Sequence, residues 1–563
     1  MIARIGKSSS ASPARGVSAA TLPVALVAAA LAACSGTIDE EPGYVYGEGL
    51  PAVIPADGNL GDGISGSGSG DPRINQRLWR LTPTQLNEEV ARLFGQGAPQ
   101  FSVPEPASES GITNIAANGV VDLGNAAPFS DGARAIGDWV AAQREGSTRC
   151  ASYGDGSCID SMLAWLVRGA FRRPVSPEEV AELRTLFTDL QTSYDYDYAI
   201  SGVVRSVLLS PDFLYRTELG DGSGVMTPYE IANLLAFAIT DRSPDGVLYD
   251  AAERGELRMP EQREAQARRL MGASHRAWQR FFWEWLSLET LESQGAEVGL
   301  DPLLVTQMEE EFRAFVSDVI VTQRGNLRQL LSASYTFAQP QLAAHYGAAH
   351  PGSGLARIEL DPAQRGGLLT QGAWLVSHGK DGKDNVVRRG MNLFKQGMCN
   401  NALAPPEGLD VNAALLDLVG PDATVRETVD ARGGSPTCGA CHQKADPMGI
   451  VFESYASDGR FQTVYPNGQP VDTAIQLESG AMFTSAPAFS ATLVDDPLFQ
   501  ACFVRRVVHY VAGIDIGAGS SVAWIEEAQA ALVSNNMSLE ELLVAVVRHP
   551  AFVERPTETE TMP

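Results

Sequence analysis

The sequence has little of what several common functions require. It holds only seven cysteines and seven histidines, and its 42 basic residues are outnumbered by 68 acidic ones, which gives a formal net charge of −26. Because nucleic-acid binding depends on clustered Lys and Arg, this balance excludes nucleic acid as an expected partner. The chain contains no G-x-S-x-G, H-E-x-x-H or phosphate-binding-loop motif, so the usual sequence marks of serine hydrolases, zinc proteases and nucleoside triphosphatases are missing.

The amino terminus has the features of a targeting signal and not of a membrane span. Arg4, Lys7 and Arg15 precede an apolar run, Thr21 to Leu31, that is too short to cross a membrane, and no later run reaches spanning length. The run ends in Leu31-Ala32-Ala33-Cys34, which resembles the signal of a bacterial lipoprotein. The resemblance implies cleavage before Cys34, lipid on its thiol and an outer-membrane location. An ordinary secretory signal with an incidental cysteine is the alternative.

A polar linker separates this signal from the ordered part of the chain. Gly58 to Pro72 reads GNLGDGISGSGSGDP, a composition that cannot bury a core and is typical of a flexible tether. The rest of the 563-residue chain is long enough for several globular domains, and its 44% hydrophobic and 20% charged residues suit them.

Helix signals dominate from residue 77 onward. Four segments begin with a capping Ser or Thr followed three residues later by Gln or Glu, and three of them carry Pro at the first helical position. These starts are Thr82-Pro83-Thr84-Gln85, Ser176-Pro177-Glu178-Glu179, Thr227-Pro228-Tyr229-Glu230 and Ser538-Leu539-Glu540-Glu541. Alternating strands are scarce, and Val464 to Val471, around an Asn-Gly pair, is the best hairpin candidate. The expected fold class is therefore mostly α.

Periodic apolar residues place the main helices and one aromatic cluster. Helices are predicted over 160–171, 178–190, 199–209, 229–239, 261–271, 277–286 and 303–321. Phe281, Phe282, Trp283 and Trp285 are interpreted as core packing between helices, because aromatic residues at this spacing are usually buried.

The most informative stretch is Cys438-Gly439-Ala440-Cys441-His442, a C-x-x-C-H pattern. Two thiols three residues apart lie on one side of a helical turn, where each can add to a vinyl group of a porphyrin, and the adjacent imidazole can ligate the iron. The pattern predicts one covalent haem c. A disulfide between Cys438 and Cys441, or half of a zinc site, are the alternatives. Asp446-Pro447 is expected to end this helix, since Pro disfavours the α conformation in the residue before it.

The iron's other face needs a second ligand or stays open. Met482 lies forty residues after His442, a separation common for the distal Met of small single-haem cytochromes, and is the predicted sixth ligand. Met398, His378 and His509 are rivals. An open face would instead allow oxidoreductase chemistry, so the sequence leaves open whether the protein is an enzyme.

The other cysteines suggest two disulfides. Cys150 and Cys158 lie eight residues apart across a Gly-rich loop, which suits a local bridge. Cys399 and Cys502 lie on opposite sides of the C-x-x-C-H stretch and are predicted to pair in an oxidising compartment, with two buried free thiols as the alternative.

Short motifs follow one another in a specific order over residues 77–555. They are Arg80-Leu81-Thr82, Phe171-Arg172-Arg173-Pro174, Ser210-Pro211-Asp212-Phe213-Leu214-Tyr215-Arg216, Arg365-Gly366-Gly367-Leu368-Leu369-Thr370, Arg389-Gly390, Cys438 to His442 and Asp446-Pro447. In this order they resemble the cytochrome-like proteins of planctomycetes and myxobacteria, which are built from consecutive domains of unknown function. The resemblance implies an exported cytochrome-like protein and supplies no substrate.

Together these features predict a lipid-anchored outer-membrane c-type cytochrome-like protein that transfers electrons to an unknown redox partner. The alternative is a haem-free cell-surface scaffold or glycan-binding lipoprotein with a structural Cys438–Cys441 disulfide. The expected organisation is a signal peptide over 1–33, a linker over 34–75, a helical N-terminal domain over 76–224, a helical middle domain over 225–384, a cytochrome c-like α module with a small β-hairpin over 385–555, and a tail over 556–563.

Overall fold

The computed structural model describes residues 74–555 apart from 106–110, 115, 117–118, 123, 144–157, 381–384, 401–418, 420–422, 437, 478–479 and 515–521. Helices make up most of this part of the chain, and its named strands form three two-stranded antiparallel sheets. The predicted mostly α fold class is confirmed. The predicted signal peptide and tail lie outside the described residues. Among the helices that are described, none is both long enough and apolar enough to cross a membrane.

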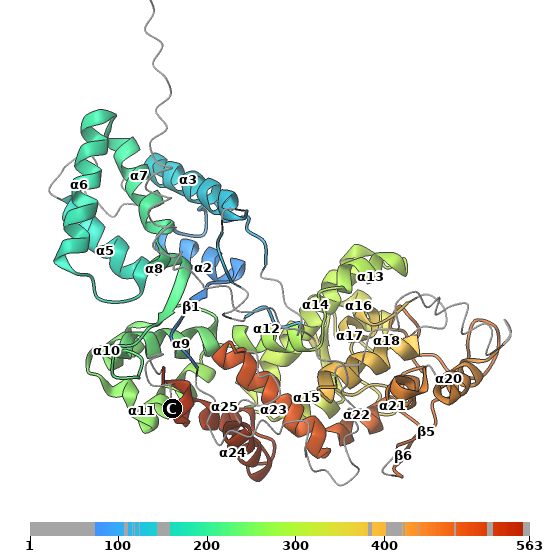
Figure 1. The fold of residues 1–563 in the computed structure, drawn as a ribbon. Helices are drawn as coiled ribbons and strands as arrows, with labels where there is room; N and C mark the ends of the chain where they lie inside the picture. The colour runs from blue at the N-terminus through green and yellow to red at the C-terminus, as the bar shows by residue number, and fades with distance from the viewer. Residues whose placement is uncertain are drawn as a thin grey trace, which may run out of the picture.

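The first group of helices packs around a core of its own (blue and teal in Figure 1). Its elements are β1 (Arg77–Arg80), α2 (Pro83–Phe94), α3 (Ala126–Gln143), α5 (Ile159–Phe171), α6 (Pro177–Ser193), α7 (Tyr196–Leu208), α8 (Pro211–Leu214) and β2 (Tyr215–Glu218). Leu86, Ile136, Leu163 and Val203 bring α2, α3, α5 and α7 into this core. The first and last elements, β1 and β2, pair antiparallel and so join the two ends of the group.

The rest of the described chain packs around a second, larger core, which also takes in Ile74, Trp79 and Ile112 from the N-terminal part and extends to Val553. Its elements are α9 (Pro228–Thr240), α10 (Gly246–Glu253), η3 (Glu256–Arg258), α11 (Pro260–Met271), α12 (Arg276–Trp285), α13 (Leu291–Glu297), α14 (Pro302–Ser317), η4 (Asp318–Thr322), α15 (Leu327–Ser332), β3 (Tyr335–Ala338), α16 (Pro340–His345), β4 (Ala356–Glu359), η5 (Leu368–Thr370), α17 (Gly372–Ser377), α18 (Asn385–Asn392), η6 (Leu393–Gly397), α20 (Val425–Gly434), α21 (Gly439–Ile450), β5 (Ile475–Gln476), β6 (Met482–Phe483), α22 (Ala486–Leu493), α23 (Pro497–Ala512), α24 (Val522–Ser534), α25 (Leu539–Arg548) and η7 (Pro550–Phe552).

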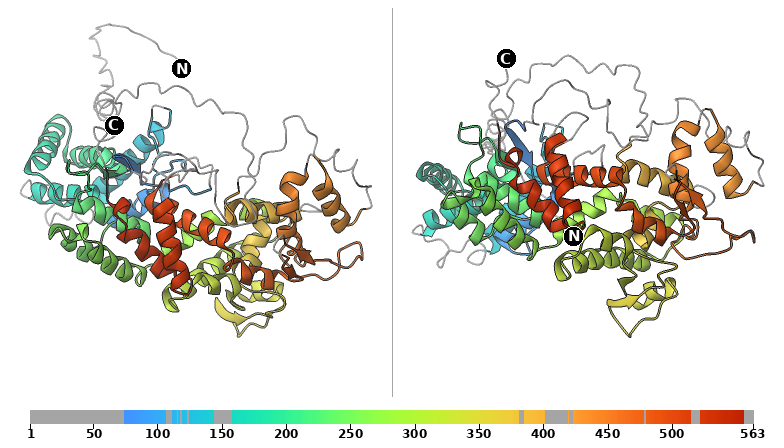
Figure 2. Two further views of the ribbon diagram at one scale, coloured as in Figure 1. Left: turned by 60° about the horizontal axis from the view of Figure 1, so that its bottom comes forward. Right: turned by 90° about the horizontal axis from the view of Figure 1, so that it is seen from below.

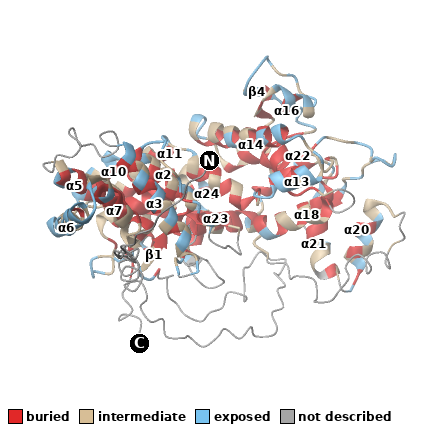
Figure 3. Ribbon diagram, turned by 90° about the horizontal axis from the view of Figure 1, so that it is seen from above, coloured by how far each residue is buried: buried red, intermediate tan, exposed pale blue. Residues whose placement is uncertain are grey.

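The C-terminal helices return to the middle of the chain. α25 packs against α11, and α23 packs against α9 and α12. In Figures 1 and 2 these red helices lie beside the green ones, whereas α20 and α21, in orange, lie at the end of the molecule farthest from the first group. Figure 3 shows buried positions on the inner sides of the helices in both groups. Residues 225–384 and 385–555 therefore share one core.

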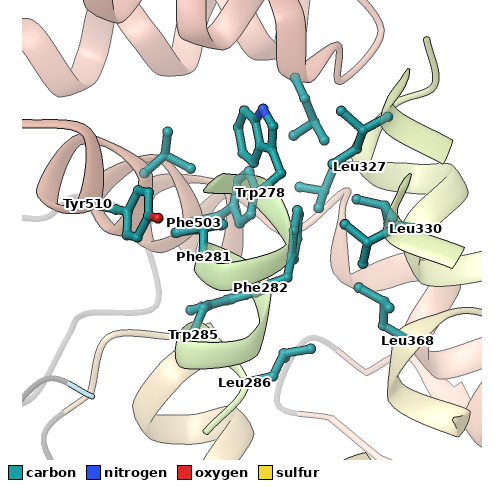
Figure 4. Close-up of a cluster of buried hydrophobic side chains, with 14 of the residues drawn as sticks. Trp278, Phe281, Phe282, Trp285, Leu286, Leu327, Leu330, Leu368, Phe503 and Tyr510 are labelled. Atoms are coloured by element: carbon teal, nitrogen blue, oxygen red, sulfur yellow. The ribbon is translucent and has the colours of Figure 1, made fainter. Parts of the chain in front are cut away.

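An aromatic cluster lies within this larger core (Figure 4). Phe281, Phe282 and Trp285 of α12 are at most 2% exposed. The ring centroid of Phe503 lies 5.2 Å from that of Trp285, and that of Tyr510 lies 5.5 Å from that of Phe281. The predicted core packing is confirmed, with Trp283 partly buried at the edge. Because Phe503 and Tyr510 belong to α23, these contacts hold the C-terminal helices to the middle of the chain.

The local signals read from the sequence are present in the structure. Thr82, Ser176 and Thr227 accept a hydrogen bond from the backbone N–H three residues on, and the Gln or Glu side chain there accepts one from the cap residue. Ser538 caps α25 through the N–H of Glu541. The predicted hairpin is a tight turn with a single antiparallel bridge between Val464 and Pro470.

Candidate cofactor site at the start of helix α21

The C-x-x-C-H stretch begins helix α21. Cys438 is the cap residue, and Cys441 and His442 lie on the first turn. Both thiols are unpaired and half-buried, so the structure does not contain the alternative Cys438–Cys441 disulfide. The described residues include no group of three or more His, Cys, Asp and Glu side chains that could hold a metal ion. A zinc site would need such a group.

A buried carboxylate orients the imidazole of His442. Its Nδ1 lies 2.9 Å from Oδ1 of Asp446, one helical turn further along α21. A carboxylate accepts hydrogen bonds, so Nδ1 is the donor, and in the neutral ring this leaves the lone pair on Nε2. The Asp446 side chain is 1% exposed, whereas that of His442 is 21% exposed. The ring is therefore held from the buried side and leaves one edge accessible.

The neighbouring helix α20 supplies the counter-charge. Arg432 donates from Nε to Oδ2 of Asp446 at 2.7 Å, and its Nη2 lies 2.7 Å from the same oxygen. The helix starts at a capping box formed by Thr424 and Glu427. Gln443 of α21 donates to the carbonyl of Gly433 at 2.8 Å, which fastens the end of α20 to the first turns of α21.

Helix α18 crosses α21 at a contact between backbones. A Cβ at Gly449 would lie 1.9 Å from the carbonyl oxygen of Val386, and one at Gly390 would lie 2.2 Å from that of Ala445. Only glycine leaves room for this approach. The prediction that Asp446-Pro447 ends the helix is wrong, since Pro447 lies inside α21. The contact with α18 explains why the helix continues. Pro447 cannot donate to the carbonyl four residues back, but α18 contacts the helix on both sides of it.

A disulfide closes the segment that carries the site. The predicted pair Cys399–Cys502 is bonded, across a sequence separation of 103 residues. Cys399 follows η6, and Cys502 is buried in α23. The loop that the bridge closes contains α20, α21 and the β5–β6 pair. Cys158 is also disulfide-bonded, whereas Cys150, its predicted partner, and Cys34, the predicted lipid acceptor, lie outside the described residues.

The candidates for a sixth iron ligand differ in their surroundings. Met482 is 71% exposed on β6, whose partner strand β5 packs against α21. Met398 is partly buried against the larger core. His378 donates from Nε2 to the carbonyl of Leu286 at 2.8 Å, and burial lowers its pKa to about 4. His509 is buried in α23, and burial lowers its pKa to about 3. Met482 stays a prediction.

Asp446 and Arg432 are the site residues that sequence reasoning missed. Asp446 had a usable signal, because residues four apart on a helix face the same side and His442 and Asp446 have that spacing. Arg432 had none, since its contact with Asp446 depends on how α20 packs against α21.

The geometry defines a mostly helical protein in which a C-x-x-C-H stretch begins a helix. Three family models match the chain in order: "Protein of unknown function (DUF1595)" over residues 158–218, DUF1592 over 226–348 and DUF1588 over 365–465. Together they cover about half of the sequence, and the third contains the candidate site. The chain therefore belongs to the planctomycete cytochrome-like family, which has this arrangement of domains. No curated protein and no solved structure is similar enough to match.

Proposed function

We propose that the protein is an exported c-type cytochrome that holds one haem through Cys438, Cys441 and His442 and passes single electrons to a partner protein. The observation that carries the proposal is the donor set at the start of α21. Two unpaired, half-buried thiols lie beside an imidazole whose Nδ1 is occupied by Asp446 and whose Nε2 is available. This set fits the group, because thioether attachment needs free thiols and iron ligation needs a nitrogen lone pair.

Each side chain has a distinct part in holding the group. The two thiols would each form a thioether bond, and the imidazole of His442 would bind the iron from one side. The bound haem supplies the one-electron chemistry, and the protein adjusts it through the axial ligand and the hydrogen bonds around it. The formal net charge of −26 suits a basic redox partner.

Haem attachment is tested on full-length protein exported together with cytochrome c maturation proteins. The wild type is expected to show a Soret band, a covalent haem stain and an intact mass increased by one haem. The Cys438→Ala, Cys441→Ala double variant should fold and carry no covalent haem. Folded, exported wild-type protein without pigment would overturn the proposal.

Whether a protein ligand occupies the sixth position of the iron determines whether the protein is an electron carrier or an oxidoreductase. If Met482 is the sixth ligand, Met482→Leu removes the sulfur-to-iron band of the oxidised protein, and the wild type does not bind carbon monoxide when reduced. Carbon monoxide binding by the wild type would instead favour an open site with oxidoreductase chemistry, because a vacant position is what small ligands need.

Membrane attachment rests on Cys34. A protein lipidated there is expected in the outer-membrane fraction and should incorporate labelled fatty acid. Cys34→Ala should lose the label and stay in the inner membrane with its signal uncleaved. Wild-type protein recovered without lipid from the soluble periplasm would contradict the anchor and leave the haem proposal standing.

A further inference from the structure

Both oxygens of the Asp446 carboxylate accept hydrogen bonds, each from a different residue. Oδ1 faces Nδ1 of His442 at 2.9 Å, and Oδ2 faces Nε and Nη2 of Arg432, both at 2.7 Å. The side chains of Asp446 and Arg432 are 1% and 6% exposed. The carboxylate therefore cannot turn away from the imidazole without leaving a buried guanidinium unpaired, which is costly.

Fold stability alone does not account for this arrangement. A buried ion pair can often be replaced by apolar residues with little loss of stability. A ring N–H can equally be satisfied by a neutral carbonyl, as His378 is by Leu286. The chain instead places a carboxylate, paired with Arg432 on its far side, directly behind the imidazole that stands next to the C-x-x-C pair. A charged acceptor on the distant nitrogen makes the ring a stronger electron donor at Nε2, which a neutral carbonyl does to a lesser degree.

We propose, on the basis of the haem attachment proposed above, that Asp446 is the positioning residue for His442 and that Arg432 holds Asp446 in place. Asp446 fixes the ring and its tautomer, and its charge favours the oxidised iron. The pair thus keeps the reduction potential of the haem lower than a neutral acceptor would. The residues act through His442 and do not touch the iron.

The test compares reduction potentials of full-length variants whose covalent haem content has first been measured. Asp446→Asn keeps the shape and removes the charge. It is expected to bind haem and to raise the potential by about 59 mV or more, which is a tenfold rise in the ratio of reduced to oxidised protein at a fixed potential. Asp472→Asn is the matched control, because Asp472 pairs with Arg426 of α20 in the same module at 2.9 Å and its side chain is 54% exposed. It should shift the potential far less.

A second variant covers the case in which Asp446→Asn fails to fold. Arg432→Met combined with Asp446→Ala removes both buried charges together and leaves no unpaired ion, and it should raise the potential in the same direction. If either folded, haem-loaded variant has the potential of the Asp472→Asn control, the inference is wrong. If the wild type carries no covalent haem, the proposed function fails instead, and the two failures are thereby told apart.

Discussion

Arg555 and Glu218 form a buried ion pair across 337 residues of sequence. Nε of Arg555 donates to Oε2 of Glu218 at 2.7 Å, and Nε of Arg77 approaches the same oxygen at 2.8 Å. Arg77 also donates to the carbonyl of Gly513 at the end of α23. One carboxylate therefore ties β1, β2 and the C-terminal end of the described chain together, at the place where the two cores meet.

Glu218 predicts how stability depends on pH. Burial alone would raise its pKa, but the guanidinium groups of Arg555 and Arg77 outweigh burial and lower the pKa from 4.5 to about 2. The stabilisation is present above the unfolded pKa near 4.5 and is lost as the pH falls toward 2, a loss on the order of 3 kcal/mol. The free energy of unfolding, measured with denaturant from pH 7 to pH 2, should show this loss in the wild type. In Glu218→Gln the free energy of unfolding should fall by about 3 kcal/mol less over the same pH range. Glu359→Gln, at a 74% exposed carboxylate, is the control and should behave as the wild type does. An unchanged acid profile in Glu218→Gln would refute the assignment.

The crossing of α18 and α21 predicts a position where a single methyl group is not tolerated. Gly449→Ala would place Cβ against the backbone of Val386, which cannot move away as a side-chain tip can, and should reduce the free energy of unfolding by about 3 kcal/mol. Gly434→Ala is the matched control, since nothing lies within 4 Å of a Cβ there and the change should stay within about 0.5 kcal/mol. Equal stability of the two variants in urea would show that the helices do not touch as described.

The Cys399–Cys502 bridge predicts sensitivity to reduction. Its loop of 103 residues is long, and the chain-entropy estimate for such a loop is roughly 4 to 5 kcal/mol. The Cys399→Ala, Cys502→Ala double variant should lose stability of that order in denaturant unfolding. Adding a thiol reductant should lower the free energy of unfolding of the wild type by more than that of the variant, in which only the bridge at Cys158 is left to reduce. A variant as stable as the wild type would contradict the estimate.

The shared core predicts that the cytochrome-like segment does not fold alone. A fragment of residues 385–555 would expose Phe499 and Phe503, which pack against Trp285 of α12. It should aggregate or show no cooperative thermal transition by circular dichroism. Residues 74–224, which carry nearly all of the smaller core, should unfold cooperatively. Cooperative unfolding of the isolated 385–555 fragment would refute this division of the core.

Features encoded within a few residues were predictable from the sequence, and those that depend on distant contacts were not. The caps at Thr82, Ser176 and Thr227 each need only four residues, and every helix predicted from periodicity corresponds to a helix of the structure. The thiols and imidazole at 438–442 could be predicted because haem attachment requires this spacing of residues along the chain.

The remaining parts of the site come from tertiary packing. Arg432 reaches Asp446 because α20 lies against α21, and no local pattern records that contact. The local sequence predicts that Pro447 ends its helix. The helix continues because α18 packs against it at Gly390, and that contact cannot be read from the residues around Pro447. The return of α25 to α11 joins segments more than 250 residues apart, which helix periodicity cannot reveal.

The four cysteines between residues 399 and 502 form two unlike pairs, one bonded and one free. Cys399 and Cys502 are joined, and Cys502 is 2% exposed, whereas Cys438 and Cys441 stay reduced and half-buried. In the folded chain the first pair is already bonded to itself, so a reagent that attacks thiols can react only with the second pair. The fold itself thus separates these four cysteines, and the pair that remains able to react is the one next to His442.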